Sequence, residues 1–193
     1  MKRLILFRHG ERTIQTGEAS GDGPLTPAGQ AVVEVYTESV IRSLRAARVT
    51  KIDLAVVSGS IRCAETFAII WRRFLEQDIK IEEYDMDRKY FATPGEIAAW
   101  NYLYRHRGKA LRRLIEKIGE KRAVMGFASE LVQLCAQRTA VPVQRALDHG
   151  AKNILVVTHG PHDALIQEQF TGVECETCLA LGTYNIIELD KRK

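Results

Sequence analysis

Two histidines, each followed by a glycine, stand directly behind short apolar runs near opposite ends of the chain. Residues 4–7 lead into Arg8 and His9, and residues 154–157 lead through Thr158 into His159. Apolar runs of this length favour buried strands over helices. Ligands of an open α/β sheet bind beyond the carboxyl ends of its strands, so both imidazoles are candidates for an active site.

A third apolar run, 54–57, is followed by Ser58-Gly59-Ser60-Ile61-Arg62. If the three runs are parallel strands, Arg8, Arg62 and the two histidines gather at one edge of the sheet. Two permanent cations and two imidazoles suit a small, multiply charged anion such as phosphate. Arg62 falls in the first turn of the following helix, where a cation is unfavourable without an anionic partner. The alternative for Arg62 is a plain surface residue.

The composition bounds the class of protein. The 193 residues are 46% hydrophobic and 27% charged, which favours one globular domain over 1–193. No apolar stretch approaches the ~20 residues of a membrane span, so we expect no membrane partner. Met1-Lys2-Arg3 resembles the start of a signal peptide, but the apolar run after it ends at Phe7. That run is too short for an export signal, so we expect a cytoplasmic protein.

The four cysteines include Cys175 and Cys178, which have the spacing of a metal or redox pair. A structural zinc site needs four ligands, and no second pair of cysteines or histidines lies at a matching offset. We therefore expect thiols near a loop, with no metal.

A basic run covers residues 105–122, where eight Lys or Arg face two Glu in a chain of net charge +4. Such a run could attract an acidic substrate or nucleic acid. Apolar residues at helical spacing, namely Leu111, Leu114, Ile115 and Ile118, instead favour a solvated helix face. We expect no nucleic-acid partner and leave the oligomeric state open.

The remaining patterns predict the element order. Gly- and Ser-rich residues 11–25 predict a loop over the carboxyl edge, and Thr26 with Pro27 predicts the start of a helix. Strands are expected at 4–7, 53–57, 79–81, 153–157 and 183–189, and helices at 26–48, 61–75, 95–106, 109–119, 127–138, 142–149 and from 162 through Phe170. The fold class is α/β, with a central, mostly parallel sheet flanked by helices on both faces and a helical cap insertion at about 83–141.

Four motifs in this order resemble the histidine phosphatase superfamily, the phosphoglycerate mutase-like enzymes. They are Arg8-His9-Gly10-Glu11-Arg12, Leu25-Thr26-Pro27-Ala28-Gly29-Gln30, Ser58-Gly59-Ser60-Ile61-Arg62-Cys63-Ala64-Glu65-Thr66 and Val157-Thr158-His159-Gly160. Each motif is weak alone, but together they span nearly the whole chain.

The resemblance implies a metal-independent phosphatase without a cofactor that acts on a small phosphorylated substrate. His9 would attack phosphorus and form a phosphohistidine that water hydrolyses. Its tautomer needs a partner, and a backbone carbonyl near Gly10 is a candidate. Arg8, Arg62 and a protonated His159 would bind the phosphoryl oxygens.

A carboxylic acid after the third strand usually protonates the leaving group in this family. The family's usual segment is absent here, and four carboxyls compete for the role: Glu82, Glu83, Asp85 and Asp87. Asp87 is favoured because Asp87-Arg88-Lys89-Tyr90 best resembles the acid-bearing segment, and Glu83 is second.

Several functions stay open within this resemblance. The alternatives to a phosphatase of small esters are a phosphoglycerate-type mutase, a protein phosphohistidine phosphatase and a non-catalytic phosphate-binding module. His162 could contact substrate or only decorate its helix. Residues 89–126, with Tyr90, Phe91, Trp100 and Tyr104, are expected to form a cap over the site.

Overall fold

The structure is a computed structural model that describes residues 1–13, 23–87, 90 and 93–189. The expected loop at 11–25 and the expected cap aromatics fall partly outside these ranges. Residues 14–22 and Phe91 are not described, and neither are the side chains of Trp100 and Tyr104.

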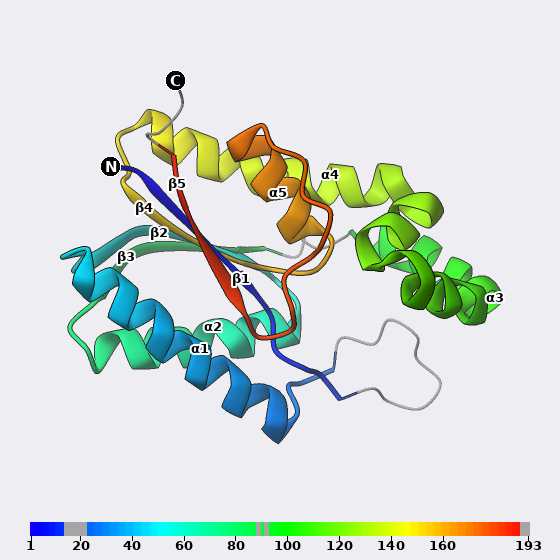
Figure 1. The fold of residues 1–193 in the computed structure, drawn as a ribbon, viewed down its shortest axis with the longest axis horizontal. Helices are drawn as coiled ribbons and strands as arrows, with labels where there is room; N and C mark the ends of the chain where they lie inside the picture. Colours follow the sequence, from blue (N-terminus) through cyan, green and yellow to red (C-terminus); the bar gives the residue numbers. More distant parts are fainter. Residues whose placement is uncertain (14–22, 88–89, 91–92, 190–193) are drawn as a thin grey trace.

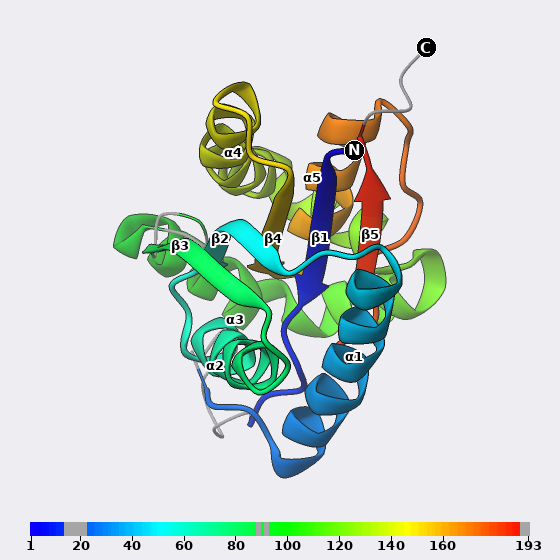
Figure 2. The same ribbon diagram turned by 90° about the vertical axis from the view of Figure 1, so that its left-hand side faces the viewer.

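The strands of the described residues form one five-stranded sheet of order β3-β2-β4-β1-β5, which Figure 2 shows. Neighbours among β3, β2, β4 and β1 are parallel, and β5 is antiparallel to β1. The strands are β1 (Arg3–Arg8), β2 (Lys51–Ser58), β3 (Lys80–Asp87), β4 (Asn153–Thr158) and β5 (Tyr184–Glu188). The expectation of a mostly parallel sheet is confirmed.

Helices cover both faces of the sheet (Figure 1). One face packs on α1 (Pro27–Ala46) and α2 (Ile61–Leu75) through a core that contains Phe7, Val57 and Phe67. The other face packs on α4 (Glu120–Asp148) and α5 (His162–Thr171) through a second core. Burial of every side chain in the apolar runs of β1 and β4 explains why those runs are continuous rather than alternating.

The strand register aligns the ends of the four parallel strands. Arg8 pairs with Thr158, Ser58 pairs with Asp87, and Val57 pairs with Val157 one step earlier. The last residues of β1, β4, β2 and β3 therefore form one row at the carboxyl edge. The two His-Gly motifs and the segment that leads to Arg62 all leave the sheet from this row.

The third strand is longer than the expected 79–81, because β3 runs from Lys80 to Asp87. Its residues are largely exposed at the edge of the sheet, so it carries polar side chains such as Glu82 and Glu83 where a central strand would be apolar. The helical segment after it begins only at Pro94. Residues 83–87 of the expected cap insertion are thus part of the sheet.

The expected helices at 95–106 and 109–119 are one helix, α3 (Pro94–Ile118), which continues through Gly108. A glycine inside a helix costs only about 1 kcal/mol, which the rest of a long helix tolerates. The expected restart at Pro142 is also wrong, since Pro142 lies inside α4. The kink in α4 is at Ala128 (φ −153°, ψ 43°), next to the expected helix start at 127.

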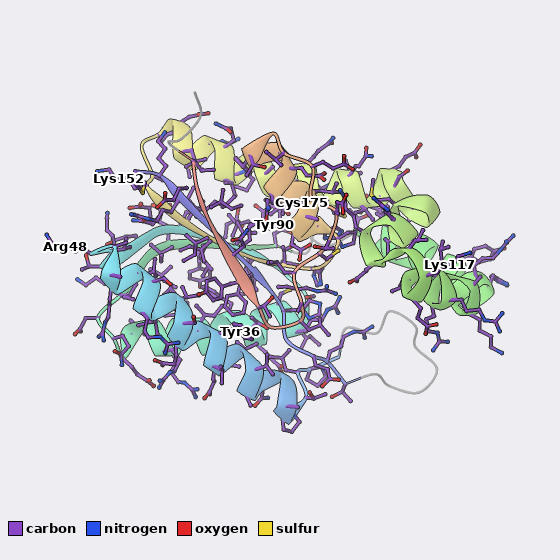
Figure 3. All side chains as sticks on the ribbon, viewed as in Figure 1. Tyr36, Arg48, Tyr90, Lys117, Lys152 and Cys175 are labelled. Carbon is purple, nitrogen blue, oxygen red and sulfur yellow. The ribbon has the colours of Figure 1, made fainter. Side chains whose placement is uncertain are left out.

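Helix α3 extends away from the sheet, and Lys117 near its end points into solvent (Figures 1 and 3). Arg107, Lys109, Arg112 and Arg113 are exposed on the same helix, and Leu111 is buried. The basic run is thus largely a solvated face, although Ile118 is 40% exposed and Lys121 is buried. None of the helices in the described ranges is long and apolar enough to span a bilayer.

Candidate active site

His9 follows β1 directly and is almost fully buried. Its Nδ1 lies 2.7 Å from the carbonyl oxygen of Gly10, which can only accept a hydrogen bond. The proton of the neutral ring therefore sits on Nδ1, and Nε2 keeps its lone pair. Burial, and then the charge of Arg62, holds the pKa of His9 well below its ordinary value. The expected carbonyl partner at Gly10 is present, and the lowered pKa keeps the ring neutral.

Arg62 approaches His9 from the first turn of α2. Its Nε donates to Nε2 of His9 over 3.2 Å, and its side chain is buried. Ser60 caps the helix, since its hydroxyl accepts from the N–H of Cys63. The N-terminus of α2 and the Arg62 guanidinium therefore face the same point, which suits an anion.

His159 lies beside His9, with ring centroids 4.9 Å apart. Its Nε2 contacts the hydroxyls of Ser58 at 2.8 Å and Ser60 at 3.3 Å. Burial, followed by the charge of Arg62, holds the pKa of His159 well below its ordinary value. These shifts favour the neutral ring in this arrangement of charges, and the expectation of a protonated His159 beside a phosphoryl group stays a prediction.

Arg8 ends β1 next to His9 and contacts Leu179 and Glu120. Its NH1 donates to the carbonyl of Leu179 over 2.7 Å and lies 2.9 Å from Oε2 of Glu120. Its NH2 donates to Oε1 of Glu120 over 3.0 Å, so the two groups form a bidentate pair. The sequence reasoning missed Glu120, because it lies in a basic run and 112 residues from Arg8.

The chain segment before β5 completes the wall around Arg8. The carboxylate of Asp163 accepts hydrogen bonds from the N–H groups of Ala164 and Leu179. Burial raises the pKa of Asp163 to about 7, and the charge of Arg8 opposes this rise. Asp163 therefore fixes the position of Leu179, whose carbonyl in turn fixes Arg8. Sequence reasoning missed this residue too, although it directly follows His162.

Two glycines allow the close packing of the motif loops. A Cβ on Gly10 would lie 2.7 Å from the carbonyl oxygen of Gly29, where the loop after His9 meets the start of α1. A Cβ on Gly160 would lie 2.7 Å from Cζ of Arg8. The glycines of both His-Gly motifs are thus required by contacts with a neighbouring element.

The four candidate acids lie at different positions along β3. Glu82 and Glu83 are exposed and come before the carboxyl edge. Asp85 accepts a hydrogen bond from the hydroxyl of the buried Tyr90. Asp87 is the last residue of β3, and the N–H of Gly59 donates to its carbonyl. Among these four, Asp87 therefore lies in the row of strand ends that carries Arg8.

His162 is buried next to the site, with its ring 5.8 Å from that of His159. Its Nδ1 has no hydrogen-bond partner among the described residues. Burial lowers the pKa of His162 to about 4, so the ring is neutral. His162 packs behind His159 as an uncharged group.

Metal-ligating side chains do not gather in the described part of the chain. No group of three or more His, Cys, Asp or Glu side chains there could hold an ion. Cys175 and Cys178 are present as thiols. Burial raises the pKa of both, that of Cys178 to about 12, which makes them poor nucleophiles.

This fold and motif set define a known family. The model of the histidine phosphatase superfamily (branch 1) matches residues 4–192, so the chain belongs to that family. The protein is accordingly a histidine phosphatase, an enzyme of phosphorylated substrates. No curated protein matches its sequence closely enough to count as a relative.

Solved structures share the fold at low sequence identity. Mycobacterial glucosyl-3-phosphoglycerate phosphatase superposes with a TM-score of 0.62 at 12% identity, over 97% of this chain and 90% of its own. Phosphoglycerate mutase from Bacillus anthracis gives 0.56 at 19% identity, over 96% and 91%. The protein histidine phosphatase SixA, complexed with tungstate, gives 0.56 at 12% identity, over 96% and 94%. At these identities the likeness establishes the fold alone.

Proposed function

We propose that this protein hydrolyses a phosphomonoester through a covalent phosphohistidine on His9. The observation that carries this is the hydrogen bond from Nδ1 of His9 to the carbonyl of Gly10, which leaves a lone pair on Nε2, next to the Arg62 guanidinium. In the first step, Nε2 attacks phosphorus, the bond to the leaving oxygen breaks, and that oxygen takes a proton. In the second step, water attacks the phosphohistidine and releases inorganic phosphate and the neutral imidazole.

The charges around His9 suit both steps. The Arg62 guanidinium already lies within hydrogen-bond distance of Nε2, the attacking atom. It can therefore donate hydrogen bonds to the phosphoryl oxygens when Nε2 attacks phosphorus. Arg8 and His159 bind the remaining oxygens. The negative charge of a bound phosphoryl group raises the pKa of His159 and draws a proton onto its ring.

Asp87 is the residue that we propose as the general acid. It ends β3 beside Ser58, whose hydroxyl contacts His159, and so lies at the edge where a leaving group departs. An acid is most needed for a poor leaving group. Asp87→Asn should therefore slow an alkyl phosphate more than an aryl phosphate, and equal effects on both would remove Asp87 from this role.

The substrate belongs to one of two classes, small phosphate esters or phosphorylated protein side chains. The exposed cationic residues of α3, with Arg112 and Arg113 among them, favour an acidic substrate of the first class. The four cysteines are present as thiols, which supports the proposed cytoplasmic location.

The test is to trap the intermediate. Rapid acid quench is unsuitable because phosphohistidine is acid-labile, so the reaction is stopped in alkaline denaturant and the protein is analysed by mass spectrometry. We expect one phosphoryl group on His9 and a loss of turnover of about 10³-fold or more in His9→Ala. His149→Ala, an exposed histidine at the end of α4, is the control. Full turnover by His9→Ala would refute the proposal, and phosphoryl transfer between phosphoglycerate isomers without release would make the enzyme a mutase.

A further inference from the structure

The contact between Arg8 and Glu120 has a chemical consequence for the pocket. A carboxylate presents two oxygens to the guanidinium fork in the same planar arrangement as two oxygens of a phosphoryl group. Glu120 therefore occupies the two donors that Arg8 would otherwise offer to a bound phosphoryl group. The third outward donor, Nε of Arg8, is buried and has no hydrogen-bond partner among the described residues.

We propose that Glu120 sets the affinity of the site for anions by competing with the ligand for Arg8. This inference rests on the proposed function, because it takes the phosphoryl site to lie between Arg8 and Arg62. A ligand reaches Arg8 by displacing the carboxylate, and that displacement lowers the affinity of every anion that binds there. The charge of Glu120 also repels a dianionic phosphomonoester more strongly than a monovalent phosphodiester.

The backbone at the start of α4 is anchored, so the Glu120 side chain can move away from Arg8 while the helix stays in place. The next residue, Lys121, is buried and pairs with the carboxylate of Glu168 on α5. Lys121 also donates to the carbonyl of Cys175 over 2.6 Å. This anchor holds the Glu120 backbone beside Arg8, and the Glu120 side chain is 31% exposed and has solvent to rotate into.

Glu120 is distinct from the residues that hold Arg8 in place. The carbonyl of Leu179 accepts from NH1, and Gly160 packs so closely that even an added Cβ would clash with the guanidinium, so both restrain Arg8 independently of Glu120. Loss of the Glu120 charge therefore leaves Arg8 oriented toward the pocket. This separation makes a gain of ligand affinity the expected result of removing Glu120, whereas loss of a positioning residue would weaken binding.

The experiment measures binding of inorganic phosphate by titration calorimetry, so it does not depend on turnover. Glu120→Gln keeps the shape of the side chain and removes its charge. A partly exposed ion pair with bidentate geometry contributes about 1 kcal/mol, so we expect phosphate to bind about fivefold more tightly. Glu130→Gln, an exposed carboxylate further along α4, removes the same charge away from Arg8 and should leave the affinity unchanged.

Two further measurements test whether Glu120 acts through Arg8. In an Arg8→Ala background, Glu120→Gln should have no effect on phosphate binding. Glu120→Gln should prefer methyl phosphate over dimethyl phosphate by a larger factor than the wild-type protein does, because the lost carboxylate charge repels a dianion more strongly than a monoanion. Equal or weaker phosphate binding by Glu120→Gln overturns the inference. Tighter binding without any hydrolysis of phosphate esters would overturn the proposed function and leave the inference standing.

Discussion

The two arginines at the carboxyl edge are held by different kinds of partner. Arg62 belongs to the α2 side of the pocket, where its Nε donates to His9. Arg8 belongs to the α4 side, where a carboxylate and the carbonyl of Leu179 take its donors. One cation therefore contacts His9 directly, and the charge of the other is partly neutralised by Glu120.

The two sides also differ in how the chain builds them. The α2 side consists of Ser58, Ser60 and Arg62, which lie within five positions of one another and are set by one strand end and one helix cap. The α4 side joins Arg8 to Glu120, Asp163 and Leu179, which come from three separate elements. The α2 side is thus specified by local sequence, and the α4 side is specified by tertiary packing.

The largest effect that tests this difference comes from removing each arginine. Arg62→Ala should lower kcat/KM by about 10³-fold or more, because the guanidinium stabilises charge on the transferred phosphoryl group. Arg8→Ala should lower it by a factor about tenfold smaller, because Glu120 already compensates part of its charge. Steady-state kinetics with an aryl phosphate measures both variants.

Arg42→Ala, on the exposed face of α1, is the control for loss of one positive charge. Its kcat/KM should stay close to that of the wild type. Equal losses in Arg62→Ala and Arg8→Ala would show that the pocket uses both cations alike, and the comparison between its two sides would fail.

Much of the fold follows from local sequence patterns. The apolar runs of β1, β2 and β4 identified the strands, and Thr26 identified the start of α1 because its hydroxyl accepts from the N–H of Gly29. The predicted length of edge strand β3 was too short, because an exposed strand has no apolar run that marks its ends. Pro142 was misinterpreted because a long helix tolerates one missing hydrogen bond when its packing is strong.

The candidate site divides in the same way. The cluster of Arg8, His9, Arg62 and His159 was predictable because each residue follows a strand end or opens a helix. Glu120 was not predictable, since its neighbours in sequence are cations and its partner lies 112 positions earlier. The lowered pKa of His159 was not predictable either, because burial and nearby arginines act through space and leave no pattern in the sequence.

The next effect in size concerns the packing of Gly160 against Arg8. A Cβ at this position would lie 2.7 Å from both Cζ and NH1 of Arg8, so Gly160→Ala should push the guanidinium out of the pocket. We expect a loss of kcat/KM of about tenfold, because small displacements of a binding group are costly in catalysis.

Gly126→Ala is the matched control, since a Cβ there meets no heavy atom within 4 Å. It should keep full activity and raise the free energy of unfolding by about 0.5–1 kcal/mol. Wild-type kinetics in Gly160→Ala would show that Arg8 has room to move, and the α4 side would then be looser than its contacts indicate.

The smallest effect on catalysis is expected at Asp163, which instead affects stability because burial raises its pKa to about 7 from an ordinary value near 3.8. The folded state binds this proton more tightly than the unfolded state does, so the contribution of Asp163 to stability is greatest at low pH. It is lost as the pH rises from about 4 to about 7, and the free energy of unfolding should fall by on the order of 4 kcal/mol from this group. Asp163→Asn should flatten that part of the pH profile in urea titrations, whereas Asp148→Asn, an exposed carboxyl on α4, should not. A profile that Asp163→Asn leaves unchanged would mean that Asp163 stays ionised beside Arg8, and the α4 side would then hold an ion pair rather than a buried neutral acid.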